Sequence, residues 1–106
     1  MIIGIPKEIM QGEKRVAAIP ETVKKMVEGG AKVLFEQGAG VGSHYLDEAY
    51  EEAGAQIVEN VEEIFEQAEV ILKVKEPQFN VNKNKHELDM MHEGQYLITF
   101  IHPASP

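Results

Sequence analysis

The sequence predicts an α/β protein with a doubly wound, mostly parallel five-stranded sheet and helices on both faces. Short apolar runs alternate along the chain with segments of helical periodicity, as they do in proteins built from βαβ units. The stretches between these runs are long enough for right-handed crossovers, which join parallel strands. Glycine and proline mark the boundaries. We therefore expect a single domain with a flavodoxin-like arrangement.

Five short apolar segments are the expected strands. Pro6 stops the first and Pro77 lies just beyond the fourth, in keeping with the inability of proline to donate a hydrogen bond within a sheet. The expected strands are Ile2–Ile5, Lys32–Glu36, Gln56–Val58, Val70–Val74 and Tyr96–Ile101.

Helix start and stop signals lie between these strands. Pro20 suits the first turn of a helix that ends at Gly29. Asp47 is expected to cap a second helix, which Gly54 closes. A third helix is expected to begin at Asn60, with Glu63 completing a capping-box pattern, and to run through Gln67.

Two segments lack a sustained period. Residues 7–19 are expected to form a long loop, and loops of that length are usually functional or disordered. Residues 82–92 are polar and only weakly helical in pattern, with Leu88 and Met91 as the expected inward positions.

Composition restricts the function. The chain has 106 residues, 18 acidic against 10 basic side chains and a formal net charge of -8, which repels nucleic acid. No cysteine occurs, so disulfides and thiolate chemistry are excluded from this chain. The apolar runs are too short to span a membrane, and the first residues lack a secretory signal, so the cytoplasm is the expected compartment.

The residues after the fifth expected strand bear on domain organisation. Only residues 102–106 follow it, which is too little chain for the element that covers a buried parallel strand. We therefore expect residues 1–106 to be an excised part of a larger two-domain protein.

Three separated cations are the candidate site residues. Arg15 lies in the long loop, whereas Lys75 and His102 follow the fourth and fifth expected strands. The carboxyl ends of strands in open α/β sheets gather ligand-binding groups, so this pattern predicts a pocket for a small carboxylate. An arginine binds a carboxylate through two parallel hydrogen bonds, and a histidine carries protons near neutral pH. The alternatives are a solvated surface arginine and a histidine that merely ends a strand.

Lys73 and Lys75 compete for the same role. They alternate with Val74 and therefore point to opposite faces of the strand, so only one can face a given pocket. Lys75 is nearer the carboxyl end of the strand and is favoured. Its ammonium group could polarise a carbonyl oxygen and hold a carboxylate as a point charge.

Other motifs give weaker predictions. The cluster Gly38–Ser43 follows a strand, but its glycines do not match the G-x-G-x-x-G spacing and the next helix does not open on the loop, so a structural turn is favoured over a dinucleotide cradle. His86 and His92 lie on different faces of any helix, so no metal site is expected.

Several motifs, taken together and in order, resemble the amino-terminal domain of alanine dehydrogenases and of the nicotinamide nucleotide transhydrogenase alpha subunit. The resemblance extends over essentially the whole chain. The motifs are Ile3 to Glu8, Glu13 to Ala17 with Pro20, Glu36 to Gly40, Ala53 to Ala55, and Lys73 to Pro77.

This resemblance implies a substrate domain, residues 1–106, that packs against a downstream NAD-binding Rossmann domain absent from this chain. Arg15 is then expected to bind the carboxylate of pyruvate or alanine, and Lys75 the carboxylate and keto oxygen. His102 is expected to act as the acid/base. NAD would be bound mainly by the missing domain, so no cofactor-binding residue is expected here. The resemblance also suggests a homo-oligomer and implies oxidation of L-alanine to pyruvate and ammonium, with the isolated chain inactive.

One departure keeps other functions open. Pro103 and Ala104 follow His102, whereas alanine dehydrogenases typically have leucine after that histidine and transhydrogenase alpha subunits have proline and alanine near this place. A transhydrogenase-type domain is therefore an alternative. The stretch around Lys75 also resembles saccharopine dehydrogenase, which would take a larger substrate. A noncatalytic carboxylate-binding module is the remaining alternative.

Overall fold

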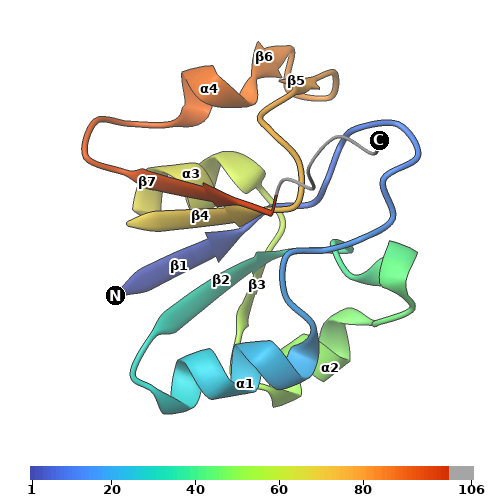
Figure 1. Ribbon diagram of the computed structural model, residues 1–106, viewed down its shortest axis with the longest axis vertical. Helices are drawn as coiled ribbons and strands as arrows, with labels where there is room; N and C mark the ends of the chain where they lie inside the picture. Colours follow the sequence, from blue (N-terminus) through green and yellow to red (C-terminus); the bar gives the residue numbers. More distant parts are fainter. Residues whose placement is uncertain (101–106) are drawn as a thin grey trace, which may run out of the picture.

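The structure, a computed structural model, describes residues 1–100 and is built on a five-stranded parallel sheet (Figure 1). All four neighbouring pairs of strands in this sheet run parallel, as predicted. The central strand pairs along its length with the second strand, from Ile2 opposite Lys32 to Ile5 opposite Phe35. The strands are β1 (Ile2–Ile5), β2 (Lys32–Glu36), β3 (Gln56–Val58), β4 (Val70–Lys73) and β7 (Tyr96–Thr99).

The strand order across the sheet is β3-β2-β1-β4-β7. The doubly wound parallel class is confirmed, but the flavodoxin-like detail is corrected, because a flavodoxin-like sheet has the order 2-1-3-4-5. Here the chain steps outward from β1 through β2 to β3 and then returns to the other side of β1. The direction therefore reverses between β1 and β4, and the crevice outside their carboxyl ends is where such sheets bind ligands.

Helices cover both faces of the sheet and enclose two apolar cores (Figure 1). On one face, the ring of Phe35 stacks on that of Tyr50 with centroids 3.7 Å apart. On the other face, Ile64 and Phe65 pack against Leu34 and Ile71. The first core includes α1 (Pro20–Glu28) and α2 (Asp47–Glu52); α3 (Val61–Gln67) and α4 (Glu87–Met90) lie against the second.

The helix boundaries follow the predicted signals with one exception. Pro20 is the first residue of α1, and the side chain of Asn60 accepts a hydrogen bond from the amide of Glu62, as expected of an N-cap. Asp47 does not cap α2, whose N-cap is Leu46. Its carboxylate instead accepts a hydrogen bond from the amide of Gly38 at 2.9 Å. Asp47 therefore holds the glycine-containing turn.

The polar segment after β4 differs from the prediction. It begins with an antiparallel hairpin of β5 (Phe79–Asn80) and β6 (Lys85–His86), and only then forms the short helix α4. Asn80 accepts a hydrogen bond from the amide of Lys83, and Asn84 adopts a left-handed φ of 51°, which asparagine tolerates. Asparagine turn chemistry thus outweighs the weak helical pattern.

The inward positions of this segment are only partly as predicted. Met91 packs against the second core, as expected. Leu88 is wrong as an inward position, since it is 58% exposed, whereas Glu87 beside it is buried at 1%. The sequence pattern fails here because a buried carboxylate with ionic partners takes the place that an apolar residue would normally fill.

The edge strand β7 is exposed on one face. Tyr96, Ile98 and Phe100 alternate along it with exposures of 71%, 48% and 49%. The strand ends at Thr99, one residue short of the last described residue, and Ile101 lies outside the described range. None of the helices between residues 1 and 100 has the length and apolar character needed to cross a bilayer.

Candidate functional site: a cationic rim at the switch point

The long first loop crosses the carboxyl edge of the sheet and is held at several points. A turn closes with a hydrogen bond from the amide of Glu13 to the carbonyl of Met10. The hydroxyl of Ser43 donates to the carbonyl of Lys14 at 2.8 Å, and the buried hydroxyl of Tyr50 donates to the carbonyl of Ala18 at 2.9 Å. These bonds fix the backbone on both sides of Arg15.

Arg15 forms a bidentate pair with Glu13. Its Nε donates to Oε2 of Glu13 at 2.9 Å and its Nη2 to Oε1 at 2.8 Å, while its backbone amide also donates to Oε2. The Glu13 side chain is 6% exposed and that of Arg15 is 48% exposed. The hydrogen bonds from Arg15 lower the pKa of Glu13 to about 2. Glu13 therefore remains an anion that orients the guanidinium group.

Arg15 lines a cavity of about 300 Å³ at the carboxyl edge of the sheet. Val74 contributes from the residue after β4, and Phe100 from the residue after β7. The cavity thus joins the loop to the ends of the two strands that carry the other predicted site residues. Its lining residues are Arg15, Val16, Ala17, Ile19, Ser43, Val74 and Phe100.

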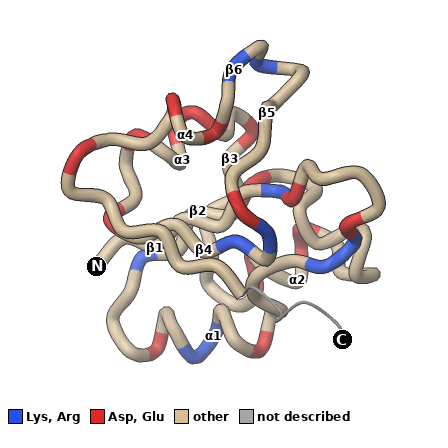
Figure 2. Tube along the Cα trace, turned by 45° about the horizontal axis from the view of Figure 1, so that its top comes forward, with Lys and Arg blue, Asp and Glu red and all other residues tan. Residues whose placement is uncertain are grey.

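The two lysines at the end of β4 have different surroundings, as their alternation predicts. Lys73 is fully buried, whereas Lys75 is half-buried. The hydrogen bonds from Arg15 are the main cause of the lowered pKa of Glu13, and the positive charge of Lys75 adds the smallest contribution. Figure 2 shows basic residues at this end of β4 and in the first loop, with acidic residues beside them.

Two buried carboxylates surround Lys73. Its Nζ lies 3.1 Å from Oε1 of Glu8 and 3.4 Å from Oε1 of Glu87. Glu8 also accepts hydrogen bonds from the amides of Val74 and Lys75. Burial raises the pKa of Glu87, and the charge of Lys73 opposes that rise. Lys73 is therefore used inside the fold, which leaves Lys75 as the more accessible of the two lysines.

His102, the third predicted cation, lies outside the described residues. The last described residue, Phe100, donates its amide to the carbonyl of Lys73 at 3.0 Å, at the end of β4. The structure thus pairs Arg15 directly with Glu13, and the substrate-binding roles of Arg15, Lys75 and His102 stay predictions.

Sequence reasoning missed three acidic residues around these cations. Glu13 stands two residues before Arg15, a spacing that allowed the bidentate pair to form. Glu8 follows the Pro6 that ends the first strand, at a place where the chain turns across the sheet edge. Glu87 carried no signal, because its burial depends on Lys73, which is distant in the sequence.

The glycines of residues 38–42 serve packing. A Cβ atom on Gly40 would lie 2.5 Å from the ring of Tyr50, and one on Gly42 would lie 2.7 Å from the carbonyl oxygen of Lys14. Both glycines are thus required by neighbouring protein atoms, and they do not fit a pyrophosphate cradle for NAD. Across residues 1–100, no group of three or more histidine or acidic side chains is arranged to hold a metal ion.

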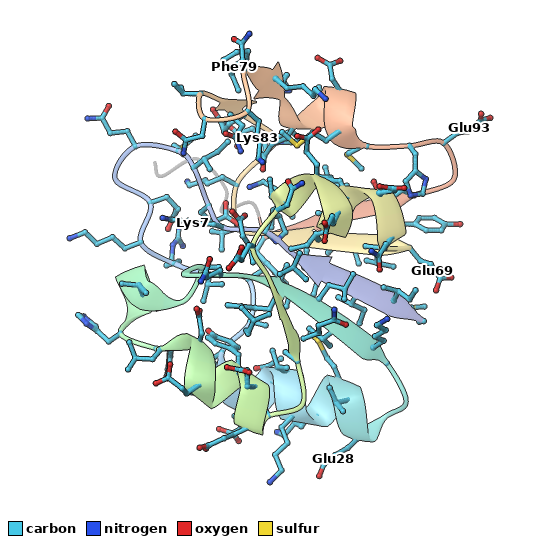
Figure 3. The ribbon with its side chains drawn as sticks, turned by 180° about the vertical axis from the view of Figure 1, so that it is seen from behind. Lys7, Glu28, Glu69, Phe79, Lys83 and Glu93 are labelled. Atoms are coloured by element: carbon cyan, nitrogen blue, oxygen red, sulfur yellow. The ribbon has the colours of Figure 1, made fainter. Side chains whose placement is uncertain are left out.

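A second cavity, of about 470 Å³, lies beside the hairpin. Lys7 and Glu36 line it from the sheet edge, and Phe79 and Lys83 line it from the hairpin. Figure 3 shows Phe79 and Lys83 in the hairpin region, above Lys7. Of the predicted cations, Arg15 lines the smaller cavity instead.

The structure is a parallel α/β domain with an arginine at a cavity on the carboxyl edge of its sheet, the edge at which such sheets bind ligands. Comparison with known proteins identifies its family. Residues 4–106 match the model of the family described as alanine dehydrogenase/PNT, N-terminal domain, and the chain belongs to this family.

Individual relatives agree with this assignment. The chain is 47% identical over 104 residues to alanine dehydrogenase of Methanococcus maripaludis and 42% identical over 105 residues to that of Bacillus subtilis. These alignments cover 98% and 99% of the chain but 26% of each relative. The chain therefore spans about a quarter of the length of the curated relatives.

Two solved structures share the fold. An L-alanine dehydrogenase superposes with a TM-score of 0.81 at 36% identity, covering 96% of this chain and 26% of that protein. A transhydrogenase from Sinorhizobium meliloti gives the same TM-score and identity, covering 95% and 28%. The predicted family and its fold are thereby confirmed.

Proposed function

We propose that this chain is the substrate-binding domain of an NAD-dependent alanine dehydrogenase. The overall reaction converts L-alanine, NAD and water to pyruvate, ammonium and NADH. The observation that carries the proposal is the position of Arg15, which is paired with Glu13 and lines a cavity at the carboxyl edge of the sheet beside Val74, the residue before Lys75. The identities to alanine dehydrogenases support the same choice.

In this proposal the two cations bind and orient a 2-oxo acid or amino acid. Arg15 binds the carboxylate of pyruvate or alanine through its guanidinium group, of which Nε and one N–H of Nη2 are engaged by Glu13. Lys75 contacts the carboxylate and the keto oxygen. Holding the substrate in one orientation lowers the entropic part of the barrier, and a cation near the oxygen stabilises negative charge that develops there.

His102 is the proposed acid/base. Its ordinary pKa range lets an imidazole give and take a proton near neutral pH. In the direction of alanine formation, protonated His102 stabilises negative charge on the substrate oxygen as the carbonyl carbon is attacked. In the reverse direction, it accepts the proton of the attacking water.

The rest of the protein is proposed to supply the cofactor site. NAD would be bound mainly by a downstream Rossmann domain, since the glycine turn of this chain is filled by its own side chains and backbone. The full-length protein is proposed to be a cytoplasmic homo-oligomer. Its partners are then a small amino or 2-oxo acid and NAD.

A pyruvate titration followed by NMR tests the substrate proposal. We expect pyruvate to shift the amide signals of residues 13–17 and 73–75, and Arg15→Ala and Lys75→Ala to weaken binding by at least about tenfold each. Lys25→Ala is the matched control, because Lys25 is exposed on α1 and pairs only loosely with Glu21 at 3.8 Å. Unchanged pyruvate-dependent shifts in both site variants would reject the proposed roles and favour a noncatalytic module.

A transhydrogenase-type domain is the second candidate. The equal similarity to the Sinorhizobium meliloti transhydrogenase supports it, as does Pro103 after His102. The assay that separates the two uses the full-length protein. Alanine-dependent NADH formation favours the dehydrogenase, and its absence favours the transhydrogenase. A preference for amino dicarboxylic substrates would instead indicate a saccharopine dehydrogenase-like enzyme.

A further inference from the structure

We propose that Glu8 is a positioning residue whose buried carboxylate fixes the backbone that presents Lys75 to the substrate. This inference rests on the proposed function, because it assigns Glu8 a task within the same carboxylate site. Nothing in the sequence motifs themselves gives Glu8 that task.

The carboxylate of Glu8 makes three short contacts with consecutive residues. Its Oε2 accepts a hydrogen bond from the amide of Val74 at 2.8 Å, and its Oε1 accepts one from the amide of Lys75 at 3.1 Å. Oε1 also lies 3.1 Å from Nζ of Lys73. One side chain of the first loop therefore holds residues 73–75 at the point where β4 ends.

The amides of Val74 and Lys75 need a hydrogen-bond acceptor such as the Glu8 carboxylate. The paired register of β4 with β7 ends at Lys73 opposite Thr99, and that of β4 with β1 ends at Ile71 opposite Gly4. Within residues 1–100, no backbone carbonyl of another strand accepts from the amides of Val74 and Lys75, whose partner is Glu8. A charged acceptor gives stronger hydrogen bonds than a neutral one, so Glu8 replaces the sheet as the constraint on Lys75.

Burial of this cluster is expensive, which argues for a specific purpose. The side chains of Glu8 and Lys73 are each 1% exposed, and that of Glu87 is 2% exposed. A buried ion pair often contributes less stability than an apolar core of the same volume. The cluster does, however, fix a unique geometry at the sheet edge.

Glu8 also acts on the proposed site through its negative charge. Its negative charge contributes, after that of Glu13, to the raised pKa of Arg15. Glu8 is therefore close enough to influence both proposed substrate-binding cations, while the cavity lining itself does not include it.

The test compares Glu8→Gln with Glu36→Gln in the same chain. Glutamine has one carbonyl oxygen and cannot accept from both amides with the original geometry, so at least one is released. We expect hydrogen exchange at the amides of Val74 and Lys75 to accelerate at least about tenfold, and the Kd for pyruvate to rise by about tenfold or more. Glu36 is a suitable control because its carboxylate accepts from the amide of Lys7 and has no hydrogen bond, among residues 1–100, with the amide of Val74 or Lys75. Wild-type exchange at both amides, or wild-type pyruvate affinity, in Glu8→Gln would overturn the proposal.

The double variant Glu8→Gln/Lys73→Met separates positioning from charge balance. In Glu8→Gln, Lys73 still has Glu87 as a partner at 3.4 Å, whereas the double variant leaves Glu87 without its cation. We therefore expect the double variant to be less stable than Glu8→Gln, while fast exchange and weak pyruvate binding persist in both. Wild-type amide exchange and wild-type pyruvate affinity in the double variant would show that Glu8 merely neutralises Lys73, and the proposal would fail.

The wild-type chain gives a measurement that needs no variant. We expect the Val74 and Lys75 amides to exchange at least about tenfold more slowly than the amide of exposed Glu76, and equal rates would overturn the proposal even if no variant folds. If the wild type shows this protection but does not bind pyruvate, the proposed function fails while the hydrogen bonds of Glu8 are confirmed.

Discussion

Arg15 is the only arginine in the sequence, and it stands in the one long loop that crosses the carboxyl edge of the sheet. A guanidinium group can bind two carboxylates at once, because its five N–H donors point in different directions. Glu13 uses the Nε side of the group and therefore orients the remaining donors. The chemical identity of residue 15 thus matters more than its charge.

Replacement of Arg15 by lysine tests this statement. An ammonium group keeps the charge but cannot contact Glu13 and a substrate carboxylate in a planar fork. We expect Arg15→Lys to weaken pyruvate binding by about tenfold or more in a calorimetric or NMR titration. Affinity within about twofold of the wild type would indicate that Arg15 acts as a simple point charge.

The pKa of Glu13 predicts a pH dependence of stability. Its folded value is lowered to about 2 from an ordinary 4.5, so ionised Glu13 stabilises the folded state fully above about pH 4.5, and this contribution is lost as the pH falls toward 2. We expect the difference in unfolding free energy between the wild type and Glu13→Gln to shrink over this range in urea titrations. Added salt should also reduce it, because Arg15 is half exposed. If this difference in unfolding free energy is constant between pH 7 and pH 2.5, the lowered pKa of Glu13 is contradicted.

At the scale of elements, the five main strands and three of the helices could be predicted from apolar periodicity, proline and glycine. Pro20 and Asn60 begin helices for local reasons that the sequence displays. The hairpin after β4 could not be predicted in this way, since its asparagine contacts compete with a weak helical pattern. The burial of Glu87 depends on a distant lysine, and local pattern does not reveal such a pair.

The contact of α3 with β1 gives an element-scale prediction. A Cβ atom on Gly4 would lie 2.5 Å from Cγ2 of Ile64 and 2.9 Å from Cβ of Ala68, so Gly4→Ala should force the helix from the sheet and cost about 1–3 kcal/mol. Gly29→Ala is the control, because its nearest atoms lie 3.4 Å away and its φ is -77°. Equal unfolding free energies of the two variants in denaturant titrations would refute this packing.

The hydrogen bond between α2 and the first loop gives a second prediction at the scale of elements. Tyr50→Phe keeps the ring stacked on Phe35 but removes the hydrogen bond to the carbonyl of Ala18. We expect a loss of about 1–2 kcal/mol in unfolding free energy. Tyr96→Phe is a matched control, since Tyr96 is 71% exposed on the edge strand. A similar effect of both changes would show that this hydrogen bond does not anchor the loop.

At the scale of the whole molecule, the site lies on an edge of the domain. Arg15 lies in the loop over the carboxyl edge of the sheet and Lys75 just beyond the end of β4. The chain spans about a quarter of the length of its curated relatives. The family could be predicted from its motifs, whereas the carboxylate site built on the three cations stays a prediction. The acidic residues that orient these cations could not, because they act through contacts formed only when the loop folds over the strand ends.

The activity of the isolated chain follows from this arrangement. We expect residues 1–106 to produce no NADH from alanine and NAD, because their one glycine-rich turn is filled by Tyr50 and the backbone of Lys14. A spectrophotometric assay of NADH formation, with alanine and NAD in excess, is the check. NADH formation above that of a heat-denatured sample would contradict the proposal that a separate downstream domain supplies the NAD site.

The convergence of Arg15 and Lys75 on one substrate carboxylate is tested most directly by a double-mutant cycle on pyruvate affinity. If both cations hold the same small anion, Arg15→Ala and Lys75→Ala each weaken binding, and the double variant is weaker by clearly less than the product of the single effects, with a coupling of about 1 kcal/mol or more. Strictly multiplicative effects would mean that the two cations act independently, and the account of a shared site would be wrong.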